Sequence, residues 1–177
     1  MKKIKCFLLS LTVLLSVNSF AQEETGSGTG LSIGAEVGLP VGDLGESHKL
    51  GLGGSLKAAF PVATDAFITV SGGYISFSGK SVSVIGQTFK APALNVIPLK
   101  AGFQYRFPGG FYLEPQLGYS IFSSKVSDDS KGAFTYAFNV GYLINKSLDL
   151  STRYEAASKE GSTIAHVGLR LAYNFSL

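Results

Sequence analysis

The residues that could perform chemistry are few, and the two histidines limit what the chain can catalyse. Hydrolysis or acyl transfer by a serine nucleophile needs a histidine base and a carboxylate within reach of the hydroxyl. His48 lies between Glu46 and Lys49 in a polar segment, and His166 lies far along the chain. Neither has a serine or an acid at a spacing that indicates a triad. We expect no enzyme, with His48 a solvated loop residue and His166 a hydrogen-bonding residue of the interior.

Metal, cofactor and phosphate sites have equally little support. Two histidines and a single cysteine, Cys6, do not indicate a transition-metal site. Asp128 and Asp129 could contact Ca²⁺, but two acids in a serine-rich segment are more typical of a solvated loop. The glycine-rich stretches 26–30 and 51–54 have no helix pattern after them, as a phosphate-binding loop requires. We therefore expect no catalytic residue, no metal and no cofactor.

The first 21 residues have the layout of a secretory signal peptide, with three lysines, an apolar stretch and small residues before a cleavage site after Ala21. The apolar stretch is shorter than the ~20 residues of a spanning helix. Cys6 precedes this stretch, whereas a lipoprotein cysteine follows it. The segment holds three of the 15 basic residues and none of the 12 acidic ones, so the predicted mature chain has no net charge. A neutral chain does not indicate a nucleic-acid partner.

The elements that must carry these residues are predicted to be strands. Residues 22–30 are polar and glycine-rich, typical of a flexible linker. After them, apolar and polar residues alternate with a period of two, which is the pattern of half-buried strands. Phe67 and Ile75 break the alternation of their segment. The predicted strands cover about residues 31–39, 52–60, 68–74, 97–107, 111–121, 134–142, 148–155 and 166–175.

The links between these segments alternate in length. The first, third, fifth and seventh links are residues 42–49, 78–93, 123–132 and 157–163, and the others are 61–65, 108–110 and 145–147. Every odd link is longer than every even one. An up-and-down barrel in an outer membrane has this arrangement, because its outer loops are long and its periplasmic turns are short.

The two faces of the predicted strands differ in both polarity and size. One face is Leu, Val, Ile, Phe and Tyr, whereas the other holds glycines, small polar residues and charges. Small residues suit the crowded inside of a narrow barrel, so the apolar face must point outward, which is stable only in lipid. We predict an all-β fold over residues 31–177: an eight-stranded antiparallel up-and-down transmembrane β-barrel.

Charged residues with inward parity form the candidate site. They are nearly balanced in sign, and an eight-stranded barrel has room only for its own side chains. We expect them to pair into a polar network that plugs the lumen rather than a selective pore. The predicted network comprises Glu36, Lys57, Lys100, Arg106, Glu114, Asp149, Arg153, Glu155 and Arg170.

Three segments resemble a known family. NVIPLKAGFQYRF at 95–107, LEPQLGY at 113–119 and YNFSL at 173–177 resemble small outer-membrane β-barrel domains common in Bacteroidota, including PorT-like, OmpX-like and OmpA-like proteins. The resemblance spans about residues 31–177. It implies a location in the bacterial outer membrane, contact with outer-membrane lipid and insertion by the barrel insertion machinery, which reads the terminal segment. It implies no activity.

Several functions remain open at this point. The leading one is a non-enzymatic, monomeric outer-membrane protein whose outer loops serve adhesion, recognition or envelope integrity, with an extracellular or periplasmic protein partner. The alternatives are a PorT-like accessory factor in protein secretion or assembly, a lipid-modifying enzyme, and a soluble lipocalin-like carrier. A lipocalin-like carrier would have its apolar face inside, so the direction of the side chains separates it from the others.

Overall fold

The computed structural model of the protein describes residues 29–84, 87–124, 127–159 and 161–176. The predicted signal peptide and most of the predicted linker, residues 22–30, lie outside the described residues. In the part of the chain described, no helix has the length and hydropathy of a transmembrane helix.

The wall of the molecule is a closed sheet of eight strands in the order β1-β10-β9-β8-β7-β6-β3-β2. All its neighbouring strands are antiparallel. The predicted fold class is confirmed. The wall strands are β1 (Gly30–Val41), β2 (His48–Ala63), β3 (Ala66–Gly79), β6 (Leu94–Arg106), β7 (Phe111–Ser124), β8 (Ser127–Leu143), β9 (Leu148–Lys159) and β10 (Ser162–Ser176).

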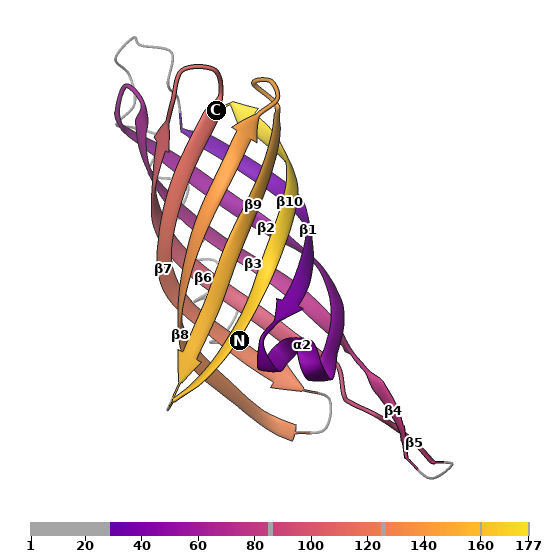
Figure 1. The fold of residues 1–177 in the computed structure, drawn as a ribbon. Coiled ribbons are helices and arrows are strands. Elements are labelled where there is room, and N and C mark those ends of the chain that lie inside the picture. Colours follow the sequence, from indigo (N-terminus) through magenta and orange to yellow (C-terminus); the bar gives the residue numbers. More distant parts are fainter. Residues whose placement is uncertain (1–28, 85–86, 125–126, 160, 177) are drawn as a thin grey trace, which may run out of the picture.

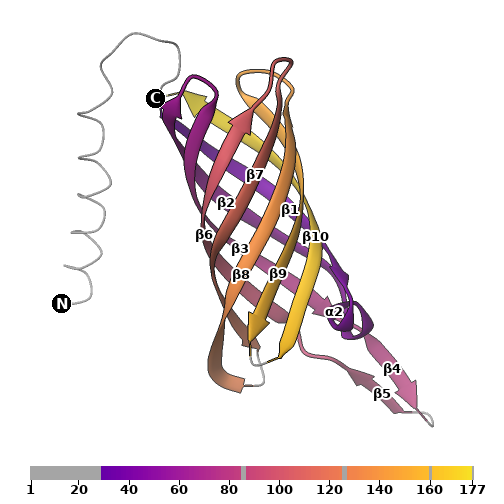
Figure 2. The same ribbon diagram turned by 60° about the vertical axis from the view of Figure 1, so that its left-hand side comes forward.

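Closure depends on β1, which pairs with β2 on one side and with β10 on the other. The register places Gly30 opposite Ser176 and Glu36 opposite Arg170. Figures 1 and 2 show the strands steeply tilted around a common axis, with the C-terminus at the end where β1 begins. Because every wall strand has two neighbours, the wall leaves no row of unpaired backbone groups to the lipid.

The two ends of the barrel differ. The end that holds Gly30 and Ser176, called the turn end, has tight connections such as Phe107–Gly110, where Gly109 and Gly110 adopt positive φ angles of 94° and 92°. The opposite end, called the loop end, carries α2 (Asp43–Ser47) and a separate two-stranded sheet of β4 (Ser81–Val84) and β5 (Gln87–Lys90). This hairpin extends well beyond the barrel (Figures 1 and 2).

The prediction that every loop-end link is longer than every turn-end link is wrong. Ser124 ends β7 and already pairs with Ser127 of β8, so this loop-end connection is shorter than the turn Phe107–Gly110. The ladder continues into segments predicted as loops, because antiparallel neighbours can keep pairing up to a tight connection. For the same reason residues 78–93 form a hairpin rather than a plain loop. Asp128 and Asp129 fall within β8, and their side chains lie outside the described residues.

The direction of the side chains agrees with the prediction that the apolar face of each strand points outward and the polar face inward. Phe103, Leu117 and Leu171 are 44%, 59% and 49% exposed on the outer surface, whereas Glu114 is 1% exposed. Alternate residues of a strand point to opposite faces, so one such assignment fixes the whole strand. A continuous apolar outer surface of this kind is stable only in hydrocarbon. The soluble lipocalin-like alternative is therefore excluded.

The outer surface also carries paired aromatic rings near the turn end. Tyr105 and Phe107, Phe111 and Tyr142, and Tyr173 and Phe175 form pairs with ring centroids 4.9 Å apart. All six side chains are exposed. Aromatic residues at this position match the interfacial girdle of outer-membrane barrels.

Candidate functional site

The lumen brings the predicted charged residues together. Eight of the nine are buried inside the barrel: Glu36, Lys57, Lys100, Glu114, Asp149, Arg153, Glu155 and Arg170. Arg106, the ninth, is partly exposed at the turn end of β6, where its guanidinium lies 3.8 Å from the centre of the Phe67 ring. This is a cation–π contact rather than a buried ion pair.

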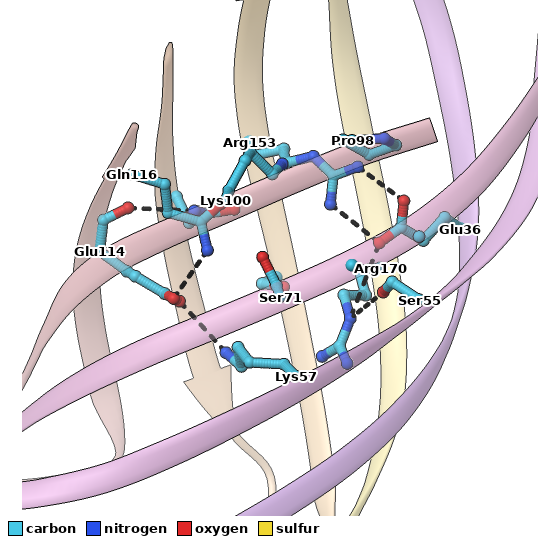
Figure 3. Close-up of a pocket in the computed structure, with 14 residues that line it drawn as sticks. Glu36, Ser55, Lys57, Ser71, Pro98, Lys100, Glu114, Gln116, Arg153 and Arg170 are labelled. Atoms are coloured by element: carbon cyan, nitrogen blue, oxygen red, sulfur yellow. Dashed lines mark hydrogen bonds and ion pairs between the residues drawn. The ribbon is translucent and has the colours of Figure 1, made fainter. Parts of the chain in front are cut away.

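Glu36 is the centre of one half of the network (Figure 3). Arg153 donates hydrogen bonds to both of its carboxylate oxygens, from Nη1 at 2.9 Å and from Nη2 at 2.6 Å. Arg170 lies on the other side, with Nε 3.8 Å from Glu36 Oε1. Because the two-pronged contact matches the planar guanidinium to the planar carboxylate, it fixes the orientation of both side chains.

Glu155 extends this half toward the loop end. It forms ion pairs with Lys100 and with Arg153, whose Nε lies 3.0 Å from Glu155 Oε2. Arg153 thus bridges two carboxylates from different strands, β1 and β9. Each charged side chain in this series of ion pairs has a neighbour of opposite charge, which offsets part of the large free-energy cost of removing the charge from water.

Glu114 is the centre of the other half, nearer the turn end. It accepts hydrogen bonds from Lys57 at 3.1 Å, Thr69 at 2.6 Å and Gln116 at 2.8 Å. Lys57 also lies 4.0 Å from Asp149, whose two carboxylate oxygens each lie 2.9 Å from the hydroxyl of Tyr112. Neutral hydrogen-bond donors, together with the single lysine, therefore stabilise these two carboxylates.

Thr69, Tyr112 and Gln116 were not included in the predicted site, although all three are buried in the lumen. Their signal was available, because Tyr112 and Gln116 share the inward parity of Glu114 on β7, and Thr69 lies on the polar face of its strand. Formal charge alone does not identify neutral hydrogen-bond donors. Partners of this kind are required wherever a carboxylate is buried.

Glycines make the room for the long side chains. A Cβ at Gly34 would lie 2.7 Å from Arg170 Nε, and one at Gly168 would lie 3.2 Å from Arg153 Cγ. A Cβ at Gly141 would overlap the Tyr112 ring. The glycines of the inward face thus leave space for the arginine and tyrosine side chains of neighbouring strands.

The loop end of the lumen contains an apolar cluster. Ile75, Phe77 and Val96 form a buried cluster, and the imidazole of His166 packs edge-on against Phe77 with ring centroids 5.3 Å apart. Among the described residues, His166 Nε2 has no hydrogen-bond partner. The expectation that His166 is a hydrogen-bonding residue is therefore wrong at this atom, because its neighbour is an apolar ring. Ile75 breaks the alternation of β3 because it belongs to this cluster.

The surroundings of the two histidines bear on the question of catalysis. His48 is a half-buried residue at the start of β2 rather than a loop residue, and its Nδ1 lies 2.8 Å from Ser47 Oγ. Within the described ranges, no carboxylate oxygen lies within 4.0 Å of either imidazole. Those same ranges hold no group of three or more His, Cys, Asp and Glu side chains arranged to bind a metal ion.

The space left between the charged side chains is very small. The cavity at the centre of the network has a volume of about 20 Å³ and is lined by residues of both halves. Such a volume holds about one water molecule. The charged side chains therefore fill the lumen, and the cavity between them is far too small for a solute pathway.

Comparison with known proteins agrees with this architecture. Residues 7–175 match the family described as outer membrane protein beta-barrel domain. The chain belongs to this outer-membrane β-barrel family. Membership implies a location in the bacterial outer membrane. The specific resemblance to PorT-like proteins of Bacteroidota stays a prediction.

Solved barrels of similar size share the fold. The attachment invasion locus protein Ail of Yersinia pestis is 18% identical over 84% of this chain and 99% of its own, with a TM-score of 0.55. Neisserial surface protein A is 17% identical over 87% of this chain and 100% of its own, with a TM-score of 0.58. The N-terminal barrel of Pseudomonas aeruginosa OprF is 14% identical over 82% and 97%, with a TM-score of 0.58. No curated protein matches the sequence.

Proposed function

We propose that this outer-membrane barrel is a non-enzymatic surface protein that recognises a protein partner outside the cell through its loop end. The β4–β5 hairpin is the contact element. The observation that carries the proposal is the contrast between a lumen filled by ion pairs and a two-stranded sheet that projects from the loop end. Export by a signal peptide cleaved after Ala21 is part of the same proposal.

The hairpin is held firmly at its base. Lys80 donates its backbone N–H to Ser47 at 2.9 Å and its ammonium to the carbonyl of Gly45, which joins the hairpin to α2. Ala91 donates its backbone N–H to Lys80 at 2.9 Å and closes the other side. A fixed base lowers the conformational entropy that a contact element loses on binding.

The hairpin also offers the backbone groups that a protein partner needs. Within the part of the chain that the structure describes, β4 and β5 pair only with each other, so each strand has one free edge. A free edge can receive an extended segment of another protein by strand addition. The name of Ail, the attachment invasion locus protein, shows that a barrel of this fold is associated with attachment in another organism. This supports a surface role here.

Labelling of introduced cysteines tests the placement of the two ends. The predicted mature chain has no cysteine, so Ser81→Cys at the hairpin and Lys146→Cys at the turn end each provide a single thiol. A membrane-impermeant maleimide is expected to label Ser81→Cys on intact cells, but Lys146→Cys only after the outer membrane has been opened. Labelling of both, or of neither, on intact cells would contradict the proposed display.

Removal of the hairpin tests the function itself. A variant in which residues 81–90 are replaced by Asn-Gly is compared with the wild type and with Lys146→Glu, a change at the turn end. We expect the deletion to lower adhesion of expressing cells to protein-coated surfaces at least tenfold, while heat-modifiable gel mobility and detergent resistance stay unchanged. Unchanged adhesion with lost detergent resistance would replace recognition by a role in envelope integrity.

A further inference from the structure

We propose that the cavity at the centre of the lumen is a binding site for a single small monovalent anion of halide size, held between Lys57, Ser71 and Lys100 and completed by Arg170. These four residues line the cavity of about 20 Å³. The inference is independent of the proposed surface function, because it concerns the interior of the barrel alone.

The register places the three side chains in one row across three strands. Ser71 of β3 pairs directly with Lys57 of β2 on one side and with Lys100 of β6 on the other. All three point inward, since all three are buried. Directly paired residues on one face have Cβ atoms about 5 Å apart, so a lysine lies on each side of the serine hydroxyl. Figure 3 shows Ser71 between Lys57 and Lys100, with Arg170 beside them.

Two of the residues that line this cavity each have a buried polar atom without a partner in the described protein. Ser71 is 9% exposed and its Oγ has no hydrogen-bond partner, and the same holds for Nη1 of Arg170, which is 6% exposed. The other guanidinium nitrogens of Arg170 are held by Ser55 at 2.9 Å and Ser32 at 3.0 Å, so Nη1 is left over in a fixed position. A buried unpaired donor is costly, which indicates a missing acceptor.

The carboxylates at the cavity are already occupied. Both oxygens of Glu36 accept from Arg153, and Glu114 accepts from three side chains. Four cationic side chains and these two carboxylates line the cavity, whereas Asp149 and Glu155, which also pair with Lys57 and Lys100, do not line it. Each lysine ammonium has three donors, more than its hydrogen bond to a carboxylate uses, which is Glu114 for Lys57 and Glu155 for Lys100. The cavity therefore offers surplus hydrogen-bond donors, which favour a ligand that only accepts hydrogen bonds.

The size of the cavity determines which hydrogen-bond-accepting ligands can fit. It holds a particle about as large as one water molecule. Chloride and bromide are near this size, whereas sulfate, phosphate and carboxylates are too large. Water fits by size, but it would bring two donors of its own into a cavity that already has a surplus of donors.

Bromide provides the direct test. Crystals of the full barrel grown or soaked in sodium bromide are expected to show an anomalous peak within the cavity, next to Ser71 Oγ and Arg170 Nη1. In detergent micelles, the unfolding temperature should rise with bromide or chloride to a plateau, and it should not rise with gluconate at equal ionic strength. A water molecule in place of the anomalous peak, or equal curves in all three salts, would overturn the proposal.

Two serine variants separate the site from general stability. Ser71→Ala removes a donor to the anion, so the bromide concentration for half of the stabilisation should rise about tenfold or more. Ser120→Ala is the matched control, because Ser120 is also buried in the lumen but does not line the cavity. Its bromide dependence should equal that of the wild type. An unchanged bromide dependence in Ser71→Ala would contradict the assignment of Ser71.

Discussion

The middle and the loop end of the lumen are filled by side chains of opposite chemical character. Both must fill a narrow space closed off by the wall. In the middle, Glu36 and Arg153 bring charges that need partners of fixed geometry. At the loop end, Phe77 and Val96 fill the space with apolar atoms that need none.

The difference teaches that strand parity determines which side chains point inward, but not what chemistry they bring. Buried ion pairs gain little net stability over apolar groups of equal volume, yet removal of one partner is severe. Apolar clusters lose stability in proportion to the space left behind. The two regions should therefore respond differently to substitution.

Glu36→Ala should have the largest effect, because it leaves both Arg153 and Arg170 without their shared carboxylate. We expect a loss of about 4 kcal/mol in the free energy of unfolding. Urea titration of the refolded barrel in micelles, followed by gel mobility, measures it. The control is Glu46→Ala in the exposed part of α2, with an expected change within about 0.5 kcal/mol. Equal losses in both variants would contradict the role of the network.

Phe77→Ala comes next, with an expected loss of about 3 kcal/mol from the cavity that it leaves. Phe134→Ala removes the same atoms from the outer face, where the side chain is 53% exposed and surrounding lipid or detergent can fill the space. The same titration should give a clearly smaller loss for this variant. A larger loss at Phe134 than at Phe77 would break the assignment of inside and outside.

Gly118→Ala tests how closely the wall strands approach each other. Its Cβ would overlap the carbonyl oxygen of Leu99 and crowd Lys100. We expect a loss of about 2 kcal/mol in the free energy of unfolding. Gly30→Ala has no atom within 4 Å of its added Cβ and should be near neutral. Equal stability of the two variants would show that the wall can relax around the methyl group.

His166→Phe should have the smallest effect. The imidazole Nε2 has no partner among the described residues and the ring packs against Phe77, so a phenyl ring keeps the contact and removes a buried polar atom. The change in the free energy of unfolding should stay within about 1 kcal/mol. A loss above about 2 kcal/mol would indicate a polar partner for His166 and weaken the contrast between the two regions.

The wall could be predicted from the sequence because a membrane barrel repeats one rule, alternation, along every strand. Phe103 and Leu117 were placed outside and Glu114 inside on this basis, and all three lie there. The rule is local, so it requires no knowledge of which strands become neighbours.

The pairing inside the lumen could not be predicted in the same way. Whether Arg153 meets Glu36 or Glu155 depends on strand stagger and side-chain length, and in the structure it meets both. The hairpin of β4 and β5 was also missed, because segments of four residues are too short for alternation to stand out. His166 was misjudged since its neighbour Phe77 comes from a strand distant in sequence.

The seam between β1 and β10 has a consequence for biogenesis. It joins residues from opposite ends of the folded chain, Gly30 and Ser176, so the circumference cannot be completed until the final strand has arrived. Such long-range pairing makes folding slow and exposes sticky intermediates. The polypeptide must therefore reach the membrane before the barrel closes and needs protection from aggregation on the way. A truncation within β10 would leave an open sheet with two unpaired edge strands instead of a closed barrel.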